Sequence, residues 1–113
     1  MECIFCRIVA GTLPATPVLE NEHVMAFRDV NPQAPVHILV VPRRHVVSVA
    51  ALVPGDAALS AALLLAAAEV ARREGLEDAG YRVVTNIGDD GGQSVDHLHL
   101  HVLGGRSLGW PPG

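Results

Sequence analysis

The chain has 113 residues, half of them hydrophobic, and a formal net charge of −4 at pH 7. This length predicts a single domain over residues 1–113, and the acidic balance argues against a general nucleic-acid-binding protein, which usually presents a basic face. No apolar run reaches the ~18 residues that a membrane span needs, and residues 1–6 lack the features of a secretory signal. We therefore expect a cytoplasmic protein that binds neither nucleic acid nor membranes.

The first half of the chain predicts a short helix followed by three strands. Residues 3–10 carry apolar side chains at helical spacing and stop before Gly11, which suits a helix C-cap. Residues 18–19 and 23–27 predict a β-hairpin around a turn. Residues 36–41 are strongly apolar and end at a proline, which predicts a buried strand.

The second half predicts one long helix and two more strands. Asp56 is expected as the N-cap of a helix whose body runs over residues 57–73, with Gly75 beyond its end. Residues 81–85 predict a strand, and residues 97–103 predict another after a loop that contains three glycines. Two helices and about five strands, joined mostly by hairpins without βαβ alternation, predict an α+β fold on an antiparallel sheet.

Three of the six histidines, His97, His99 and His101, alternate along the last predicted strand. Successive side chains of a strand point to opposite faces, so these imidazoles are expected on one face at intervals of about 6.5 Å. Such a row suits either zinc ligation or covalent phosphoryl chemistry. The preceding loop favours phosphate, because its small residues let backbone N–H groups approach an anion and Gln93 and Ser94 add donors.

Residues 91–106, GGQSVDHLHLHVLGGR, resemble the signature of the histidine triad (HIT) family, in which histidines alternate with apolar residues. Residues 31–37, NPQAPVH, and the tail GWPPG are similar to the histidine triad nucleotide-binding (HINT) branch in particular. The similarity runs from Ile4 to the last residue. It implies a HIT-like fold with one long and one short helix, whose sheet continues across a homodimer.

The resemblance implies a hydrolase that cleaves the P–N bond of purine nucleoside phosphoramidates and releases a nucleoside monophosphate and an amine. The family's nucleophile is the middle histidine, here His99, which would carry the nucleotide as a covalent intermediate. His101 is the expected general acid or stabiliser of the phosphoryl oxygens, and His37 would orient the histidine relay that includes His97. Ser94 is expected near the phosphate or leaving group, and no cofactor is required for this chemistry.

A nucleotide pocket is implied by the same resemblance. Asp29 matches the carboxylate that accepts hydrogen bonds from both ribose hydroxyls, and Arg28 stands where relatives often carry histidine. Trp110, in the tail, is expected to reach the substrate pocket of the partner in a twofold homodimer. The apolar positions that match the base pocket are Phe5, Ile8, Phe27 and Val30. The positions expected around the nucleotide's phosphate are Asn86, Gly92, Gln93, Ser94, His99 and His101.

Cys3 and Cys6, the two cysteines of the chain, are spaced C-x-x-C and predict a metal half-site, a redox pair or plain thiols rather than a structural disulfide. Some HIT relatives, and the more distant galactose phosphate uridylyltransferases, complete such a site with two histidines. The resemblance implies that these are His45 and His97 here, which would make a structural zinc site beside the nucleophile. A metal ligand and an active-site relay are competing roles for His97.

Other functions remain open at the level of sequence. Within enzymes, the alternative is hydrolysis of dinucleoside polyphosphates, as in the fragile histidine triad branch. From other classes come a nucleotide-binding regulatory or scaffold protein and a structural module in which the triad serves zinc.

Overall fold

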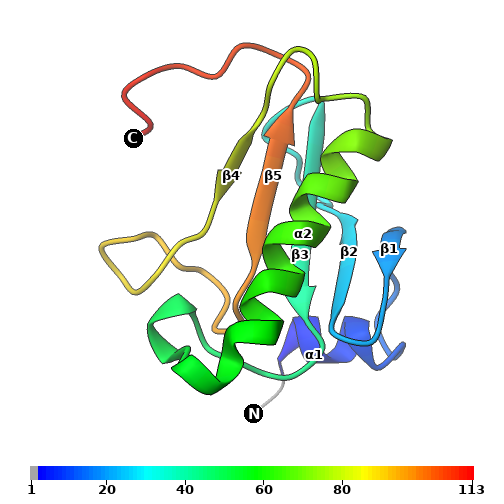
Figure 1. Cartoon of the computed structure of the whole chain (residues 1–113), viewed down its shortest axis with the longest axis vertical. Coiled ribbons are helices and arrows are strands. Elements are labelled where there is room, and N and C mark those ends of the chain that lie inside the picture. The colour runs from blue at the N-terminus through cyan, green and yellow to red at the C-terminus, as the bar shows by residue number, and fades with distance from the viewer. Residues whose placement is uncertain (1–2) are drawn as a thin grey trace.

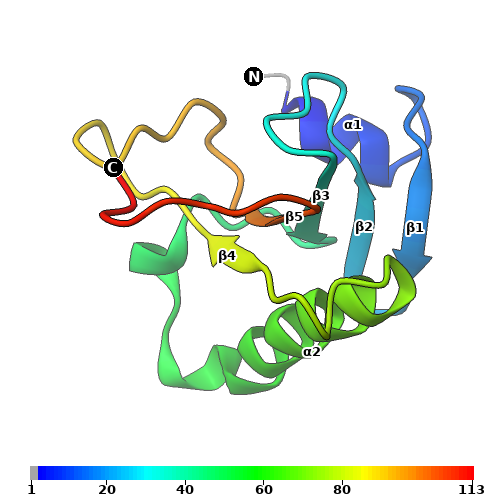
Figure 2. The same ribbon diagram turned by 90° about the horizontal axis from the view of Figure 1, so that it is seen from above.

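The computed structural model describes residues 3–113, which form a five-stranded antiparallel sheet with a helix on each face (Figures 1 and 2). The strands lie in the order β1-β2-β3-β5-β4. The α+β prediction is thus confirmed. The strands are β1 (Pro17–Glu20), β2 (Val24–Arg28), β3 (Val36–Pro42), β4 (Arg82–Val84) and β5 (Leu100–Gly104). The helices are α1 (Ile4–Val9) and α2 (Ala57–Arg73), with two 3₁₀ turns, η1 (Val49–Ala51) and η2 (Pro54–Asp56), between β3 and α2.

The central strand β3 is apolar because both of its faces are covered. Ile38 and Val40 belong to the core beneath α2, whereas Leu39 and Val41 pack with Phe5 of α1 on the opposite face. This alternation is the period of two that a strand imposes. It places His37, two residues before Leu39, on the α1 face as well, and that face carries the site.

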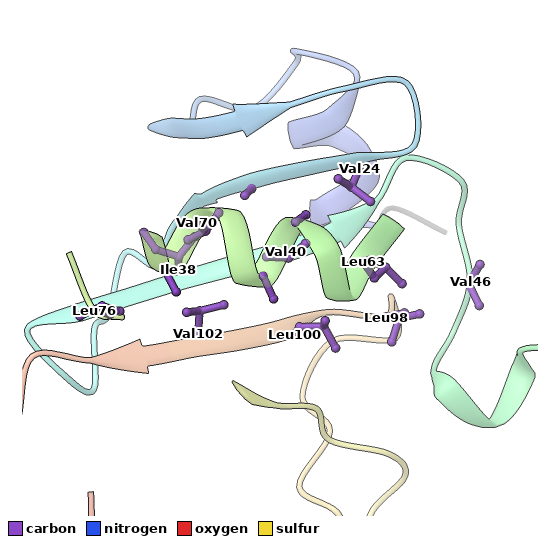
Figure 3. Packing of buried hydrophobic residues seen from close by; sticks show 14 residues of the cluster. Val24, Ile38, Val40, Val46, Leu63, Val70, Leu76, Leu98, Leu100 and Val102 are labelled. Atoms are coloured by element: carbon purple, nitrogen blue, oxygen red, sulfur yellow. The ribbon is translucent and has the colours of Figure 1, made fainter. Parts of the chain in front are cut away.

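The larger core lies between α2 and the sheet (Figure 3). Leu63 and Val70 of α2 pack with Ile38 and Val40 of β3 and with Val102 of β5. All five side chains are at most 3% exposed. Because Val102 fills this face, its neighbour in the chain, His101, is directed to the α1 face.

By length and composition the stretch Pro54–Arg73 meets the requirements of a membrane span, so the expectation that no such stretch exists needs correction. Its hydropathy has a physical explanation in the fold, because Leu63, Ala67 and Val70 are buried against the sheet. Leu64 and Leu65 of the same helix remain 63% and 68% exposed. The helix therefore has one face in the core and a second apolar face on the surface.

The N-terminal end of α2 differs in detail from what the sequence suggests, whereas the C-terminal end agrees with it. Asp56 is the N-cap residue, but its carboxylate does not bond to the helix; it accepts hydrogen bonds from the Val53 amide and from Arg44. The hydrogen bonds from Arg44 and Val53 hold the pKa of Asp56 below its usual range. At the other end Gly75 has a φ of +72°, as expected for a glycine that terminates a helix.

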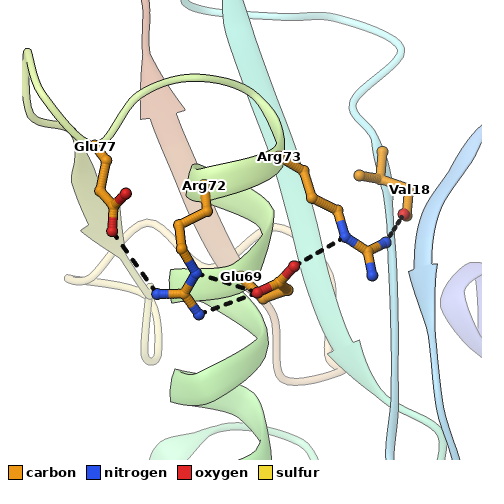
Figure 4. Close-up of polar contacts among 5 residues, drawn as sticks. All are labelled: Val18, Glu69, Arg72, Arg73 and Glu77. Atoms are coloured by element: carbon orange, nitrogen blue, oxygen red, sulfur yellow. Dashed lines mark hydrogen bonds and ion pairs between the residues drawn. The ribbon is translucent and has the colours of Figure 1, made fainter.

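Arginines on the last turns of α2 tie the helix to its surroundings (Figure 4). Glu69 accepts hydrogen bonds from Arg72 and Arg73, and Arg73 also donates to the Val18 carbonyl of β1 at 2.8 Å. These ion pairs are exposed, so they contribute little to stability. The bond to Val18 nevertheless fixes the helix end over the edge strand.

The histidine strand is shorter than predicted, since regular pairing begins at Leu100 and not at residue 97. Residues 97–99 run instead beside the loop after β3, where the Leu98 amide donates to the Val46 carbonyl at 2.6 Å. Leu98 still points into the α2 core, so the alternation of faces continues beyond the strand. His97 and His99 therefore share the α1 face with His101 although they lie outside β5.

Candidate active site and metal centre

A cavity of about 540 Å³ opens on the α1 face of the sheet. Its apolar wall comes from α1 and the chain after it, together with β2 and β3. Its polar wall holds Asp29, His37, Ser94, His99 and His101. Four predicted base-pocket residues, Phe5, Ile8, Phe27 and Val30, line this cavity. A mostly apolar cavity with a few convergent polar groups is the usual form of a small-molecule site.

His99 has its reactive nitrogen defined by a hydrogen bond to the main chain. Its Nδ1 lies 2.7 Å from the carbonyl oxygen of His97. A carbonyl oxygen only accepts, so the proton of the neutral ring is on Nδ1 and the lone pair is on Nε2. The Phe5 ring packs edge-on against the imidazole, with centroids 5.1 Å apart. His99 is therefore a buried imidazole with one nitrogen available for nucleophilic attack.

His37 and His101 form a hydrogen-bonded pair whose proton positions also follow from the main chain. The Gln33 amide donates to Nδ1 of His37 at 3.0 Å, so the proton of His37 is on Nε2. That Nε2 lies 2.9 Å from Nδ1 of His101. His101 accepts at Nδ1 and consequently carries its own proton on Nε2. The pair thus presents an N–H donor from the side chain of His101.

Burial keeps both members of this pair neutral. Burial, and to a lesser extent the neighbouring His99 and His37, lowers the pKa of His101 to about 4. Burial also lowers the pKa of His37, against the opposing effect of the Asp29 carboxylate. An acid catalyst works best with a pKa near the working pH, so a neutral His101 suits hydrogen bonding to a phosphoryl oxygen better than proton donation.

Asp29 and Arg28 are adjacent in sequence but act on different faces. The Asp29 carboxylate lines the cavity, accepts the Asn31 amide at Oδ1, and has Oδ2 3.4 Å from Nε2 of His37. The Arg28 guanidinium instead forms a two-pronged hydrogen bond with Glu74 at the end of α2, at 2.8 and 3.0 Å. The guanidinium of Arg28 is thus committed to Glu74, although Arg28 also contributes to the lining of the cavity.

The glycine-rich loop before the triad is held by its own side chains. Gln93 accepts the Gly88 amide and donates to the Val47 and Val95 carbonyls. The Asn86 side chain donates to the Gly91 carbonyl, and a Cβ at Gly91 would collide with the carbonyl of residue 87.

These hydrogen bonds determine which residues of the loop reach the cavity. Asn86, Gly92 and Gln93 do not line the cavity in this chain, whereas Ser94 does. The predicted contact of Asn86, Gly92, Gln93 and Ser94 with phosphate stays a prediction. What the bonds do establish is a fixed loop that carries Ser94 to the cavity rim.

Behind the cavity, Cys3, Cys6, His45 and His97 converge on one point. Nδ1 of His97 lies 3.2 Å from Sγ of Cys3, 3.5 Å from Sγ of Cys6 and 3.2 Å from Nδ1 of His45. Sγ of Cys6 lies 3.3 Å from Nδ1 of His45, and all four ligand atoms lie within 4.8 Å of one another. Tetrahedral zinc at ordinary bond lengths would separate two nitrogens by roughly 3.3 Å and a nitrogen from a sulfur by roughly 3.5 Å. These four of the six ligand–ligand distances therefore agree with the edges of a zinc tetrahedron.

The protonation of His97 also fits a metal. Its Nε2 lies 2.9 Å from the carbonyl oxygen of Pro42, which places the proton there and leaves a lone pair on Nδ1. His97 is completely buried and its ring does not line the cavity. The side chain faces the cysteines while the carbonyl reaches His99, so one residue serves both places.

The second group close enough to hold a metal, Asp29, His37 and His101, fits one poorly. Nε2 of His37 would have to be the ligand atom, yet it carries the proton because Nδ1 accepts the Gln33 amide. A neutral imidazole cannot donate a lone pair through a protonated nitrogen. We assign this group to hydrogen bonding.

Trp110 lies away from the cavity of its own chain and is 84% exposed. The tail that carries it passes beside β4, where the Arg82 side chain donates to the carbonyls of Leu108 and Gly109. The predicted role of Trp110 involves a second subunit and stays a prediction.

Several groups that shape the site were missed by sequence reasoning because they belong to the main chain. The Gln33 amide and the Pro42 and His97 carbonyls fix three imidazole protons. Any residue type supplies such groups, so no residue pattern identifies them. The contribution of the segment after α1, residues 13–15, to the cavity wall was also missed.

The chain is similar in sequence and structure to known proteins. A family model described as the HIT domain matches residues 10–108. The chain is 49% identical, over 99% of its length and 97% of the other protein, to an uncharacterised HIT-like protein of Synechococcus elongatus. A crystal structure of a HIT family hydrolase from Legionella pneumophila is 46% identical and has a TM-score of 0.97, covering 99% of this chain and 100% of that one. A histidine triad nucleotide-binding protein from Candida albicans is 29% identical with a TM-score of 0.84, over 97% and 83% of the two chains.

Proposed function

The chain belongs to the HIT domain family and is hydrolase-like, and from this premise we propose that it hydrolyses purine nucleoside phosphoramidates at the α-phosphorus. The observation that carries the proposal is the Nδ1 bond from His99 to the His97 carbonyl, which leaves Nε2 of His99 unprotonated in a nucleotide-sized cavity. A phosphoramidate is a suitable substrate for such a nitrogen, because its amine is the group to be displaced.

In the proposed reaction Nε2 of His99 attacks phosphorus in line with the departing amine. A bond from His99 to phosphorus forms, the P–N bond of the substrate breaks, and the amine takes a proton from solvent at the cavity mouth, where Ser94 hydrogen-bonds it. Water then attacks the same phosphorus and loses a proton to solvent, and the bond between His99 and phosphorus breaks, which releases the nucleoside monophosphate and regenerates His99. The Nε2–H of His101 stabilises the phosphoryl oxygens in both steps.

The apolar wall of the cavity would hold the purine and Asp29 the ribose. Phe5 and Phe27 pack edge to face, with centroids 5.6 Å apart, and supply aromatic surface for a base. Arg28 is occupied by Glu74, so base recognition in this proposal relies on apolar contact rather than on that guanidinium.

We also propose that Cys3, Cys6, His45 and His97 hold a structural zinc ion. The distances and the proton on Nε2 of His97 support this assignment. When bound, the ion would supply a fixed link between the start of α1 and the residue whose carbonyl orients His99. The proposed hydrolysis involves no step at the ion.

A twofold homodimer completes the proposal. Leu64 and Leu65 of α2 and Val83 of the edge strand β4 are exposed apolar residues. Within residues 3–113 no strand pairs with the outer edge of β4, which would let β4 pair with its copy. Trp110 would then contact the partner's cavity. Light scattering at micromolar concentration should give twice the mass of the chain, and Leu64→Glu with Leu65→Glu should give the single mass. A wild-type monomer would contradict this arrangement.

Trapping the intermediate tests the reaction. The protein is mixed with adenosine 5′-phosphoramidate, quenched early and digested, and mass spectrometry should find one AMP adduct, on the peptide that contains His99. His99→Ala should abolish the adduct and turnover while retaining AMP binding, and His23→Ala, an exposed histidine outside the site, should behave as wild type. Wild-type turnover by His99→Ala would refute the mechanism. Preferred cleavage of diadenosine polyphosphates would redirect the substrate assignment.

A further inference from the structure

One N–H group in the cavity has two acceptors. His37 donates from Nε2, because its Nδ1 accepts the Gln33 amide. That Nε2 lies 2.9 Å from Nδ1 of His101 and 3.4 Å from Oδ2 of Asp29. One hydrogen atom cannot bond fully in both directions, so the imidazole and the carboxylate compete for it.

Asp29 is held in place for this contact by the chain around it. Its Oδ1 accepts the Asn31 amide at 2.8 Å, and its own amide donates to the His37 carbonyl at 3.0 Å. The side chain is 18% exposed and lines the cavity. Because one carboxylate oxygen is anchored, Oδ2 has a defined position between the His37 ring and the space for a ligand.

The charges around the pair also point to Asp29. The titratable groups that face His37 and His101 are Asp29, after β2, and His99, before β5. The Asp29 carboxylate raises the pKa of both imidazoles, whereas burial lowers the pKa of both more strongly. Asp29 is therefore the one negative charge among these groups that attracts the shared proton.

We propose that Asp29 is a positioning residue for the His37–His101 pair and thereby links recognition of the sugar to the chemical step. This inference rests on the proposed function, in which Asp29 accepts the ribose hydroxyls. A hydroxyl that donates to Oδ2 occupies a lone pair and weakens the pull of Asp29 on the hydrogen of His37. That hydrogen then bonds to His101 alone, which makes the Nε2–H of His101 a stronger donor.

The consequence is kinetic. The ribose hydroxyls strengthen a contact that His101 makes with the phosphoryl oxygens as charge develops on them, so the hydroxyls raise kcat and do not only lower KM. A carboxylate that merely bound the sugar would change KM and leave kcat unaltered.

Two substrates and three variants test the link. Wild-type protein should cleave the 2′,3′-dideoxy analogue of adenosine 5′-phosphoramidate with kcat about tenfold lower than the parent substrate, as expected for the strength of one hydrogen bond. In Asp29→Asn, which removes the competing negative charge, kcat should be equal for the two substrates and near the wild-type value for the parent substrate. In His37→Phe, which removes the hydrogen itself, kcat should be lower and equal for the two substrates, while KM should still depend on the hydroxyls. Asp78→Asn, the same charge change at an exposed position outside the cavity, should match wild type. Equal wild-type kcat for the two substrates would overturn the inference.

Nitrogen NMR of the imidazoles gives a readout that needs no turnover. Binding of AMP should move the Nδ1 resonance of His101 toward that of a stronger hydrogen bond, and 2′,3′-dideoxy-AMP, which has the same phosphate, should move it less. Identical shifts would overturn the link. If the shifts differ but no phosphoramidate is cleaved, the proposed reaction fails while the contact between Asp29 and His37 stands.

Discussion

Two clusters of histidine lie on either side of His99, and they are built from the same residue type for different chemistry. In the cysteine cluster, defined as Cys3, Cys6, His45 and His97, the His97 ring donates a hydrogen bond to the Pro42 carbonyl and keeps a lone pair on the nitrogen that faces the cysteines. In the hydrogen-bonding pair, defined as His37 and His101, Nδ1 of His37 accepts a hydrogen bond from the Gln33 amide, and Nε2 keeps a proton to donate to His101. The difference arises because the main-chain partner of the His97 ring is a carbonyl, whereas that of the His37 ring is an amide.

This comparison shows how little a histidine motif determines alone. The second hydrogen bond of an imidazole sets which nitrogen is protonated, and that choice decides between ligand, donor and nucleophile. His99 connects the two clusters, since its Nδ1 bonds to the carbonyl of His97 and its ring lies 5.0 Å from that of His101. Because the two clusters contact His99 through different residues, a substitution in one cluster should change different properties of the protein from a substitution in the other.

Removing one ligand of the cysteine cluster should give the largest effect. His45→Ala takes an exposed imidazole from the proposed tetrahedron, so zinc affinity should fall at least ~100-fold and Tm by ~10 °C or more. Zinc content by mass spectrometry and thermal unfolding measure the two losses. His23→Ala removes another exposed histidine, away from the cluster, and should alter neither quantity. Unchanged zinc content in His45→Ala would show that the cluster is not the metal site.

Damage to the hydrogen-bonding pair should spare the metal. His101→Leu removes the donor aimed at the phosphoryl oxygens and should lower kcat by about 100-fold with little change in KM. His101→Gln offers an amide N–H in nearly the same place and should recover part of the loss. Zinc content and Tm should stay near wild type in both. Loss of zinc from either variant would mean that the two clusters are not independent.

The sequence was sufficient for the fold because the fold depends on patterns of side chains. The run of apolar residues in β3 and the glycine after α2 predicted those elements nearly to the residue. The strand of the triad was predicted too long, because the loop that meets residues 97–99 has no strand pattern and its pairing with Leu98 is a single main-chain bond.

Within the site, the sequence could name side chains but not their protons. The alternation of the triad correctly placed three imidazoles on one face, and the C-x-x-C spacing pointed to a cluster that the fold assembles. Spacing could not show that the side chain of His97 faces the cysteines while its carbonyl faces His99. The orientation of the ring depends on a hydrogen bond to the carbonyl of Pro42, 55 residues earlier in the chain.

The smallest effect we expect is a pH dependence of stability that belongs to the hydrogen-bonding pair. Burial lowers the pKa of His101 to about 4 in the folded protein, whereas an unfolded chain has the ordinary value near 6.5. Between about pH 4 and 6.5 the unfolded state therefore binds the extra proton, so acid favours unfolding and stability rises with pH across this window. Above about pH 6.5 His101 is neutral in both states and adds no pH dependence.

Denaturant unfolding of wild type and His101→Gln at several pH values isolates this contribution, because the cysteine cluster is common to both proteins. The wild-type free energy of unfolding should fall more steeply than that of the variant as the pH is lowered from 6.5 to 4. His37, whose pKa is also lowered by burial, leaves the variant with a residual slope of the same sign. Parallel curves would mean that His101 is protonated as readily in the folded as in the unfolded chain, and a neutral His101 donor could then no longer be assumed in the acidic range.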